Sequence, residues 1–400
     1  MFAGASLPTT EEEVWRYSRI DDLDLDDFVP ASGAGAADGD AASGVPELLR
    51  PLVDAAPIRA ALVVARNGRV VHAEVRDDLA AKGMRAERTG EPDAGVLGAA
   101  IDQAPDVFLG FNDAFVGDPV VVRVPAAVAV DAPVVVAHVT EGDGRAAFPR
   151  LVVDAGEDSE VSVLEIQVSG PEPSLVVPVT EIVVGRAARV GHMTVQQLGL
   201  ATWQLGLQVA SVEAEASLRT TTIGFGGDYT RLRTDCRMVG RGATGELDAV
   251  YFGEGDQTLD FRTFQDHIAA DCTSNLLFKG AVGGRSRSVY TGMIRVGKQA
   301  RGTDAFQTNR NVKLSDGAWA ESVPNLMIEN NDVRCSHASA VGPIDEEQRF
   351  YLESRGLPTD EAERLIVSGF FDEVLDRAPV RSVVPLLRST VAAKFERREA

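Results

Sequence analysis

The sequence predicts a mainly β protein with an N-terminal α/β segment and a C-terminal helical segment. Short runs rich in valine, isoleucine and threonine recur from about residue 120 onward, separated by glycine or glycine–aspartate turns. Later runs alternate strictly between apolar and polar residues, as half-buried strands do. After Gly342 the apolar spacing changes to that of a helix. Many short strands without intervening helices suit a sandwich, a barrel or a β-solenoid, and the pattern alone leaves all three open.

The predicted N-terminal helical and α/β segment comprises residues 1–118. Thr10 followed three residues later by Glu13 is a capping-box pattern, which predicts a short helix after Thr10. A stretch near 31–44 is rich in alanine, glycine, serine and aspartate and indicates a flexible linker. Two β-rich runs then flank Asn67-Gly68, a dipeptide typical of a tight hairpin turn.

The predicted β core comprises residues 119–341. Leu232 and Cys236 share the apolar face of one alternating run, and Asp235 lies on its polar face. We therefore expect Cys236 to be a core residue, as isolated cysteines often are. The glycines at 240–245 match a dinucleotide-binding pattern, but no helix follows them, so they predict a turn between strands.

The predicted C-terminal helical segment comprises residues 342–400. Asp345-Glu346-Glu347 indicates a helix start with acidic side chains at its positive end. A second helix begins at a cap on Thr359 or Asp360, and a third is expected after Pro379. Such helices either pack on the ends of the β body or offer a partner a groove, and packing is the default expectation. The apolar face predicted for the second helix consists of Ala362, Leu365, Ile366, Phe370 and Val374.

Composition argues against several classes of function. The formal net charge of -21, with no local basic patch, argues against a nucleic-acid partner because phosphates would be repelled. Three scattered cysteines are too few for a disulfide framework. The chain start lacks a signal-peptide pattern and no apolar run reaches spanning length, so we expect a cytoplasmic protein without a membrane partner. No P-loop, zinc-protease or serine-hydrolase motif occurs, so the residues give no independent case for a catalytic centre.

Cys335 and His337 form the chemically most informative motif. They follow the strand-like run 326–328 at alternate positions, so a continuing strand would project both from one face. A thiol and an imidazole suit zinc and iron–sulfur chemistry. A zinc ion or an iron–sulfur cluster usually takes four ligands, so the missing ones must come from elsewhere in the fold or from another chain. The alternative is that both are ordinary core or surface residues.

The C-terminal motif and shorter matches along the chain resemble a known family. The motif consists of Asp332-Val333-Arg334-Cys335-Ser336-His337, Val341-Gly342, Asp345-Glu346-Glu347, Phe350-Tyr351-Leu352 and Ser354-Arg355-Gly356. Further matches include Trp15-Arg16-Tyr17, Asn112, His267, Lys279-Gly280, Gly292 and Pro324. Together they resemble SufD, one branch of the SufB/SufD family of the SUF iron–sulfur cluster assembly scaffold. SufB-like chains carry glutamates around this histidine, whereas Cys335 and Ser336 precede it here, which favours SufD.

The resemblance implies a right-handed parallel β-helix core in a non-catalytic scaffold subunit. It implies pairing with SufB through the β-helices and binding of the ATPase SufC by the C-terminal helices. It also implies an iron–sulfur cluster that is transient and shared with SufB, with none stably bound by this chain alone. Two alternatives are a SufB-like paralogue that acts as the main scaffold and a β-solenoid carbohydrate-active enzyme. The sequence leaves open whether the chain also forms a homodimer.

The same resemblance implies roles for particular residues. His337 and Cys335 are the implied cluster-binding, or metal-binding, residues, and we expect both to point outward towards the face that meets SufB. The residues implied to bind SufC are Phe350, Tyr351, Leu365, Ile366 and Phe370.

Overall fold

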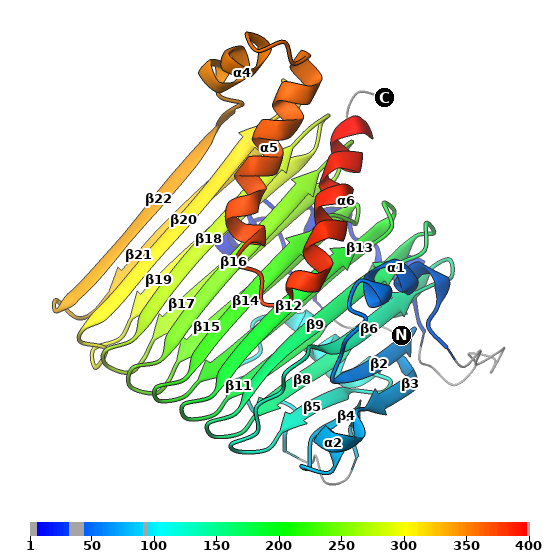
Figure 1. The fold of residues 1–400 in the computed structure, drawn as a ribbon, viewed down its shortest axis with the longest axis vertical. Coiled ribbons are helices and arrows are strands. Elements are labelled where there is room, and N and C mark those ends of the chain that lie inside the picture. Colours follow the sequence, from blue (N-terminus) through cyan, green and yellow to red (C-terminus); the bar gives the residue numbers. More distant parts are fainter. Residues whose placement is uncertain (1–5, 32–43, 91–94, 398–400) are drawn as a thin grey trace.

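The computed structural model describes residues 6–31, 44–90 and 95–397. Its body is a parallel β-solenoid in which the chain adds strands alternately to two facing sheets (Figure 1). This confirms the mainly β prediction and selects the solenoid among the three arrangements that the pattern left open. The linker predicted near 31–44 falls on 32–43, outside the described residues.

The strands form two sheets, which we call sheet A and sheet B. Sheet A runs in the order β21 (Trp319–Ile328), β19 (Arg287–Val296), β17 (Thr258–His267), β15 (Tyr229–Met238), β13 (Thr202–Val212), β11 (Val179–Val184), β8 (Arg150–Ala155), β5 (Val120–Val124) and β4 (Arg85–Arg88), with β1 (Val29–Pro30), β7 (Arg145–Ala147) and β10 (Ser174–Val176) beside this path. Sheet B runs in the order β22 (Val333–Pro343), β20 (Thr303–Lys313), β18 (Thr273–Val282), β16 (Thr244–Gly253), β14 (Ser217–Gly224), β12 (Arg189–Gln197), β9 (Glu160–Ser169), β6 (Val134–Thr140), β2 (Ala61–Arg66) and β3 (Arg69–Val75).

The helices lie outside these sheets. The α-helices are α1 (Arg50–Asp54), α2 (Asp77–Ala80), α3 (Val107–Phe115), α4 (Glu346–Glu353), α5 (Thr359–Leu375) and α6 (Val384–Arg397). The 3-10 helices are η1 (Glu13–Trp15), η2 (Ile20–Asp22), η3 (Leu25–Asp27), η4 (Glu47–Leu49) and η6 (Arg381–Val383). No described helix has the length and apolar character needed to cross a membrane.

Several local predictions are confirmed and one is wrong. Asn67-Gly68 forms the turn of the antiparallel β2–β3 hairpin, with φ of 49° and 76°. Asp345 caps α4, because its carboxylate accepts the N–H groups of the next turn. The capping box at Thr10 does not form. Glu12 precedes η1 without capping it, and the Thr10 hydroxyl donates to Asp21 instead.

Alternate side chains of each strand point into the space between the sheets. At the N-terminal end of the solenoid much of this interior is aliphatic, with Val136, Val153 and Val163 fully buried. Cys236 lies in the same cluster, which confirms its prediction as a core residue. Close packing of such side chains is the main stabilising term for stacked coils.

Helices α5 and α6 lie along the outer face of sheet B rather than on the ends of the β body (Figure 1). The predicted face of α5 is confirmed in part, because Ala362 and Val374 are fully buried. Leu365, also on that face, is exposed, whereas Phe371 outside it is fully buried. A buried lysine also links each of α5 and α6 to the solenoid through a hydrogen bond. Lys279 on β18 donates to the main-chain oxygen of Phe370 at 2.9 Å. Lys394 on α6 donates to the carbonyl of the residue just after β14, at 2.8 Å. The buried residues of α5 are Ala362, Val367, Phe371, Val374 and Leu375.

The N-terminal segment and α3 cover part of the outer face of sheet A. Trp15 packs there against Phe108, with the ring centroids 5.7 Å apart. Arg231, on the predicted polar face of β15, is buried beneath this cover, and its guanidinium lies 3.9 Å from the Trp15 ring centroid. Asn112 on α3 donates to two main-chain carbonyls that lie directly beside β8 and β10, at 2.8 and 2.9 Å. These contacts join the N-terminal segment to the solenoid.

Because His267 is buried, we expect the protein to lose a defined part of its stability in acid. Burial lowers the pKa of His267 to about 4, against about 6.5 for an imidazole in an unfolded chain. Between these values the unfolded chain binds a proton that the folded chain does not, so the free energy of unfolding falls as the pH falls through this window. We expect His267 to account for about 2 kcal/mol of the difference between about pH 7.5 and about pH 5.

Urea unfolding at both pH values measures this difference. The variant His267→Gln has no imidazole at this position. Its free energy of unfolding should therefore fall less between the two pH values, and only the fall caused by other groups should remain. An equal pH dependence in the two proteins would contradict the assignment.

Candidate functional site

The solenoid ends in an open coil. Within the described residues, β21 and β22 are the last strands of their sheets, and each pairs with a neighbour on one side only (Figure 1, upper left). Most side chains of both strands are exposed or half-buried, unlike those of the preceding coils. The exposed apolar side chains on these two strands include Leu326, Met327, Ile328 and Val341. Unpaired strand edges with apolar side chains are a template for another β structure.

Cys335 and His337 both lie on β22, in register with Ala305 and Gln307 of β20. They share one face, as the alternation predicted, and that face is the inward one of the last coil. Cys335 is half-buried and packs against a cluster that includes Ile294. The expectation that both side chains point outward is therefore wrong. Cys335 packs at the end of the core, and His337 shares its inward face. His337 is exposed because no further coil covers it within the described residues.

The surroundings of Cys335 do not favour its thiolate. Burial raises the pKa of the Cys335 thiol, and the nearby Asp304 carboxylate adds to this effect. The neutral thiol is a weaker nucleophile and ligand than the thiolate. Among the described residues, no group of three or more histidine, cysteine, aspartate or glutamate side chains is placed to hold a metal ion. Cys335 and His337 thus stand as a pair at the open end.

The last coils have a polar interior that the sequence analysis missed. Gln265 and His267 of β17 both hydrogen-bond the hydroxyl of Ser274 on β18, at 2.7 and 2.8 Å. Gln307 of β20 is fully buried, and neither atom of its amide has a hydrogen-bond partner. These residues occupy the inward positions of their strands. The alternation of the strands could have placed these residues inside the solenoid. It did not do so, because inward positions were expected to carry apolar side chains.

The five residues expected to bind SufC separate into two groups. Phe350 and Tyr351 on α4 are 71% and 57% exposed, and Leu365 in the first half of α5 is also exposed. Ile366 and Phe370 are half-buried against the cluster between α5 and sheet B. Helix α4 stands beyond the end of β22, at the top of Figure 1. The exposed aromatic surface is therefore on α4, and Ile366 and Phe370 contribute mainly to packing.

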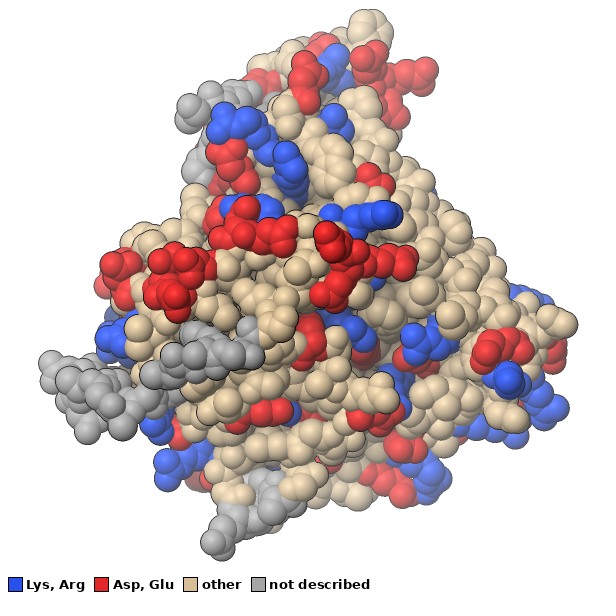
Figure 2. Space-filling model, turned by 180° about the vertical axis from the view of Figure 1, so that it is seen from behind, with Lys and Arg blue, Asp and Glu red and all other residues tan. Residues whose placement is uncertain are grey.

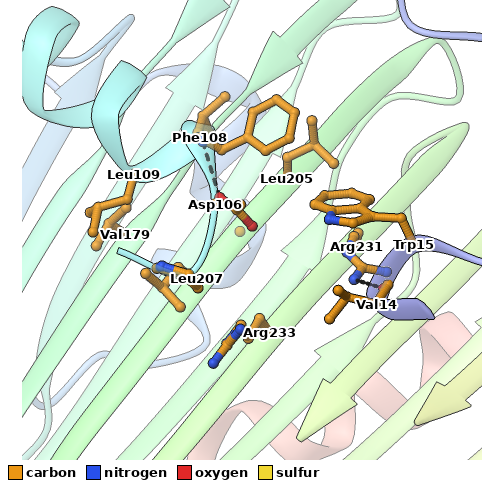
Figure 3. Close-up of a pocket in the computed structure, with 13 residues that line it drawn as sticks. Val14, Trp15, Asp106, Phe108, Leu109, Val179, Leu205, Leu207, Arg231 and Arg233 are labelled. Carbon is orange, nitrogen blue, oxygen red and sulfur yellow. Dashed lines mark hydrogen bonds between the residues drawn. The ribbon is translucent and has the colours of Figure 1, made fainter. Parts of the chain in front are cut away.

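A hollow lies on the outer face of sheet A, between η1 and α3 (Figure 3). The charged groups that line it already bind other side chains or the main chain. Arg231 donates to the main-chain oxygen of Val14 at 2.6 Å and pairs with Asp260. Asp106 accepts the N–H of Phe108 at 3.0 Å. Arg231 thus holds the N-terminal segment on the sheet, whereas the Asp106 carboxylate caps α3.

The side of the molecule opposite α5 and α6 carries interspersed acidic and basic side chains (Figure 2). Asp235 pairs with Arg233 at 2.8 Å, and Asp154 pairs with Arg123 at 2.8 Å. A glycoside hydrolase needs two carboxyl groups free to act on one glycosidic bond. Carboxylates paired with arginines along the outer face of sheet A do not form such a pair.

Comparison of the sequence with known proteins gives matches within one family. A family model described as "SUF system FeS cluster assembly, SufBD core domain" matches residues 138–370. An iron–sulfur cluster assembly SufBD family protein of Mycobacterium tuberculosis is 36% identical over 323 residues, which cover 78% of this chain and 79% of the relative.

Two further relatives are named iron–sulfur cluster assembly protein SufD. The protein from Escherichia coli is 26% identical over 376 residues, or 92% of this chain and 85% of the relative. The protein from Bacillus subtilis is 28% identical over 276 residues, or 68% of this chain and 63% of the relative.

Proposed function

The chain belongs to the SufBD family of the SUF iron–sulfur cluster assembly system, and from this premise we propose that it is a SufD-type scaffold subunit. In this role it pairs with a SufB subunit through the open end of its solenoid and binds the ATPase SufC through its C-terminal helices. It has no catalytic activity of its own. The nascent cluster is its cargo, held transiently at the junction with SufB.

The open coil that carries His337 is the observation on which the proposal rests. Strands β21 and β22 have 10 and 11 residues, so a partner solenoid can continue both sheets along a long edge. Pro324 in β21 suits an edge strand, because proline has no N–H to donate. His337 would then lie where the two chains meet, and SufB would supply the ligands that this chain lacks.

The two proposed cluster residues have unequal roles. His337 presents an exposed imidazole, a ligand type that suits iron. Cys335 is half-buried as a thiol of raised pKa, so binding a metal would require it to lose both its proton and part of its packing. We therefore assign the main contribution to His337 and expect the essential thiolate to come from SufB.

The SufD assignment is preferred to the two alternatives. A SufB-like main scaffold would hold a cluster without a second solenoid, whereas Cys335 and His337 have no third ligand among the described residues. A carbohydrate-active enzyme would require free carboxylates, and those of sheet A named above are paired with arginines.

Co-expression with SufB and SufC, followed by anaerobic purification and ultraviolet–visible spectroscopy, tests the proposed function. We expect a complex of the three chains that carries iron–sulfur absorption. The chain purified alone should contain no stoichiometric iron and sulfide. A stable cluster on the isolated chain, or failure to copurify with SufB, would contradict the assignment.

Substitution of the exposed aromatic residues on α4 should weaken SufC binding. Phe350→Ala combined with Tyr351→Ala removes two side chains of the kind that dominate interfaces, so we expect the dissociation constant to rise about 30-fold or more. Both side chains are exposed, so the thermal midpoint should stay unchanged. Isothermal titration with SufC measures the loss, and unchanged affinity would mean that SufC binds elsewhere.

A further inference from the structure

Gln307 is a buried amide without internal partners at the open end of the solenoid. It is fully buried on the inward face of β20, and both its Nε2 and Oε1 lack a hydrogen-bond partner. An unsatisfied buried polar group costs roughly 1–3 kcal/mol, so a native structure usually gives such a group a partner or a role. Leu276 precedes Gln307 along the same inward row, and His337 follows it.

The amide of Gln307 has a preferred orientation. Its Nε2 end reaches across the interior to Gly292 of β19, beside the hydroxyl of Tyr290. A side chain at Gly292 would collide with both groups, so the glycine provides the space that the amide occupies. Since Nε2 is directed towards sheet A, Oε1 is the end of the amide that is left to accept a hydrogen bond from another partner.

His337 is the residue placed to use that acceptor. It is the register partner of Gln307 on the adjacent strand, where backbones lie about 4.8 Å apart. Both side chains point to the same face. The imidazole is exposed and can turn about its side-chain torsions without displacing packed neighbours.

We propose that Gln307 is a positioning residue for His337: its Oε1 accepts the N–H of one ring nitrogen and leaves the lone pair of the other nitrogen directed out of the open end. This rests on the proposed function, in which His337 meets the nascent cluster. The hydrogen bond made by one ring nitrogen decides which nitrogen is free to bind metal. Loss of such a supporting partner typically lowers metal affinity 10- to 100-fold.

The tautomer of His337 in the isolated chain tests this proposal independently of cluster assembly. The chain has five histidines, so ¹⁵N-histidine labelling gives a simple spectrum, and the signals lost in His337→Gln identify that ring. We expect one ring nitrogen of His337 to carry the proton predominantly. Gln307→Leu should shift the population towards a mixture, whereas Gln307→Glu, which keeps an acceptor in the same place, should retain the single tautomer.

Asn309→Leu is the matched control. It replaces another buried amide on the same face of β20, but one whose hydrogen bonds go to Tyr251 and Asn311. It should leave the His337 tautomer unchanged despite a similar disturbance of the coil. An unchanged tautomer in Gln307→Leu, or equal shifts in Gln307→Leu and Asn309→Leu, would overturn the proposal.

A second measurement separates this proposal from the proposed function. In the complex with SufB and SufC, Gln307→Leu should slow cluster assembly about tenfold, and Gln307→Glu should restore most of the rate. The His337 tautomer could depend on Gln307 while cluster assembly proves insensitive to His337→Ala. In that case the contact between Gln307 and His337 is correct, and the role of His337 at the cluster is wrong.

Discussion

Replacing Ile328 and Val341 with lysine should abolish pairing with SufB while the chain remains folded. Both side chains are exposed at the open end, Ile328 on β21 and Val341 on β22, so each sheet edge would carry one charge. Burying an unpaired ammonium in the junction costs several kcal/mol per ion. We expect the dissociation constant for SufB to rise about 1,000-fold or more.

The control for this experiment is Leu200→Lys. Leu200 is an exposed apolar residue in the turn between β12 and β13, several coils away from the open end. Its substitution adds a charge without touching the proposed junction, so SufB binding should be unchanged. Analytical ultracentrifugation of each variant with SufB measures pairing. If the double lysine variant pairs normally, the solenoids do not join at this end.

Phe371→Ala should lower the free energy of unfolding by about 3–5 kcal/mol, the range for removing a fully buried aromatic ring. Phe371 lies between α5 and sheet B, and its ring is 6.3 Å from that of Phe252. Helix α5 is therefore part of the core. A truncation at about Gly342 would uncover this face of sheet B, so it should destabilise the solenoid as well as remove SufC binding.

Phe350→Ala supplies the matched comparison in urea unfolding. Phe350 is the same residue type in the same C-terminal region but is exposed on α4, so its substitution should change stability by less than about 0.5 kcal/mol. A similar, small effect at both positions would mean that α5 docks loosely and is free to move onto a partner.

Patterns that depend on near neighbours in the chain predicted much of the fold. The alternation around Cys236 placed that residue in the core, Asn67-Gly68 predicted the hairpin, and Asp345 predicted the start of α4. Each follows from two- or four-residue spacing and local hydrogen bonding. The choice of a solenoid came from the family resemblance, because alternation is common to all sheets.

Features created by distant contacts could not be predicted in the same way. Arg231 lies on a polar strand face yet is buried, because η1 and α3 return to cover that part of sheet A. Gln307 occupies an inward position that alternation alone would assign to an apolar residue. Leu365 satisfied the helical period but is exposed, since the angle at which α5 docks on sheet B decides which side of the helix is buried.

The candidate site shows the same division. The shared face of Cys335 and His337 followed from their spacing, whereas their different exposure follows from the end of the solenoid. Cys335 meets a cluster that includes Ile294 and Val296 of sheet A, residues about 40 positions earlier in the chain. No local pattern distinguishes the last coil from the coils before it.

The most direct test of the account is the rate of cluster assembly by the complex of SufB, SufC and this chain with His337→Ala. We expect an intact complex of unchanged composition, because one exposed side chain seldom decides a large interface. The assembly rate should fall at least about tenfold. Cys335→Ser should have a smaller effect or none. An unchanged rate in His337→Ala, or loss of the complex itself, would contradict the assignment of His337 as a residue that binds the nascent cluster.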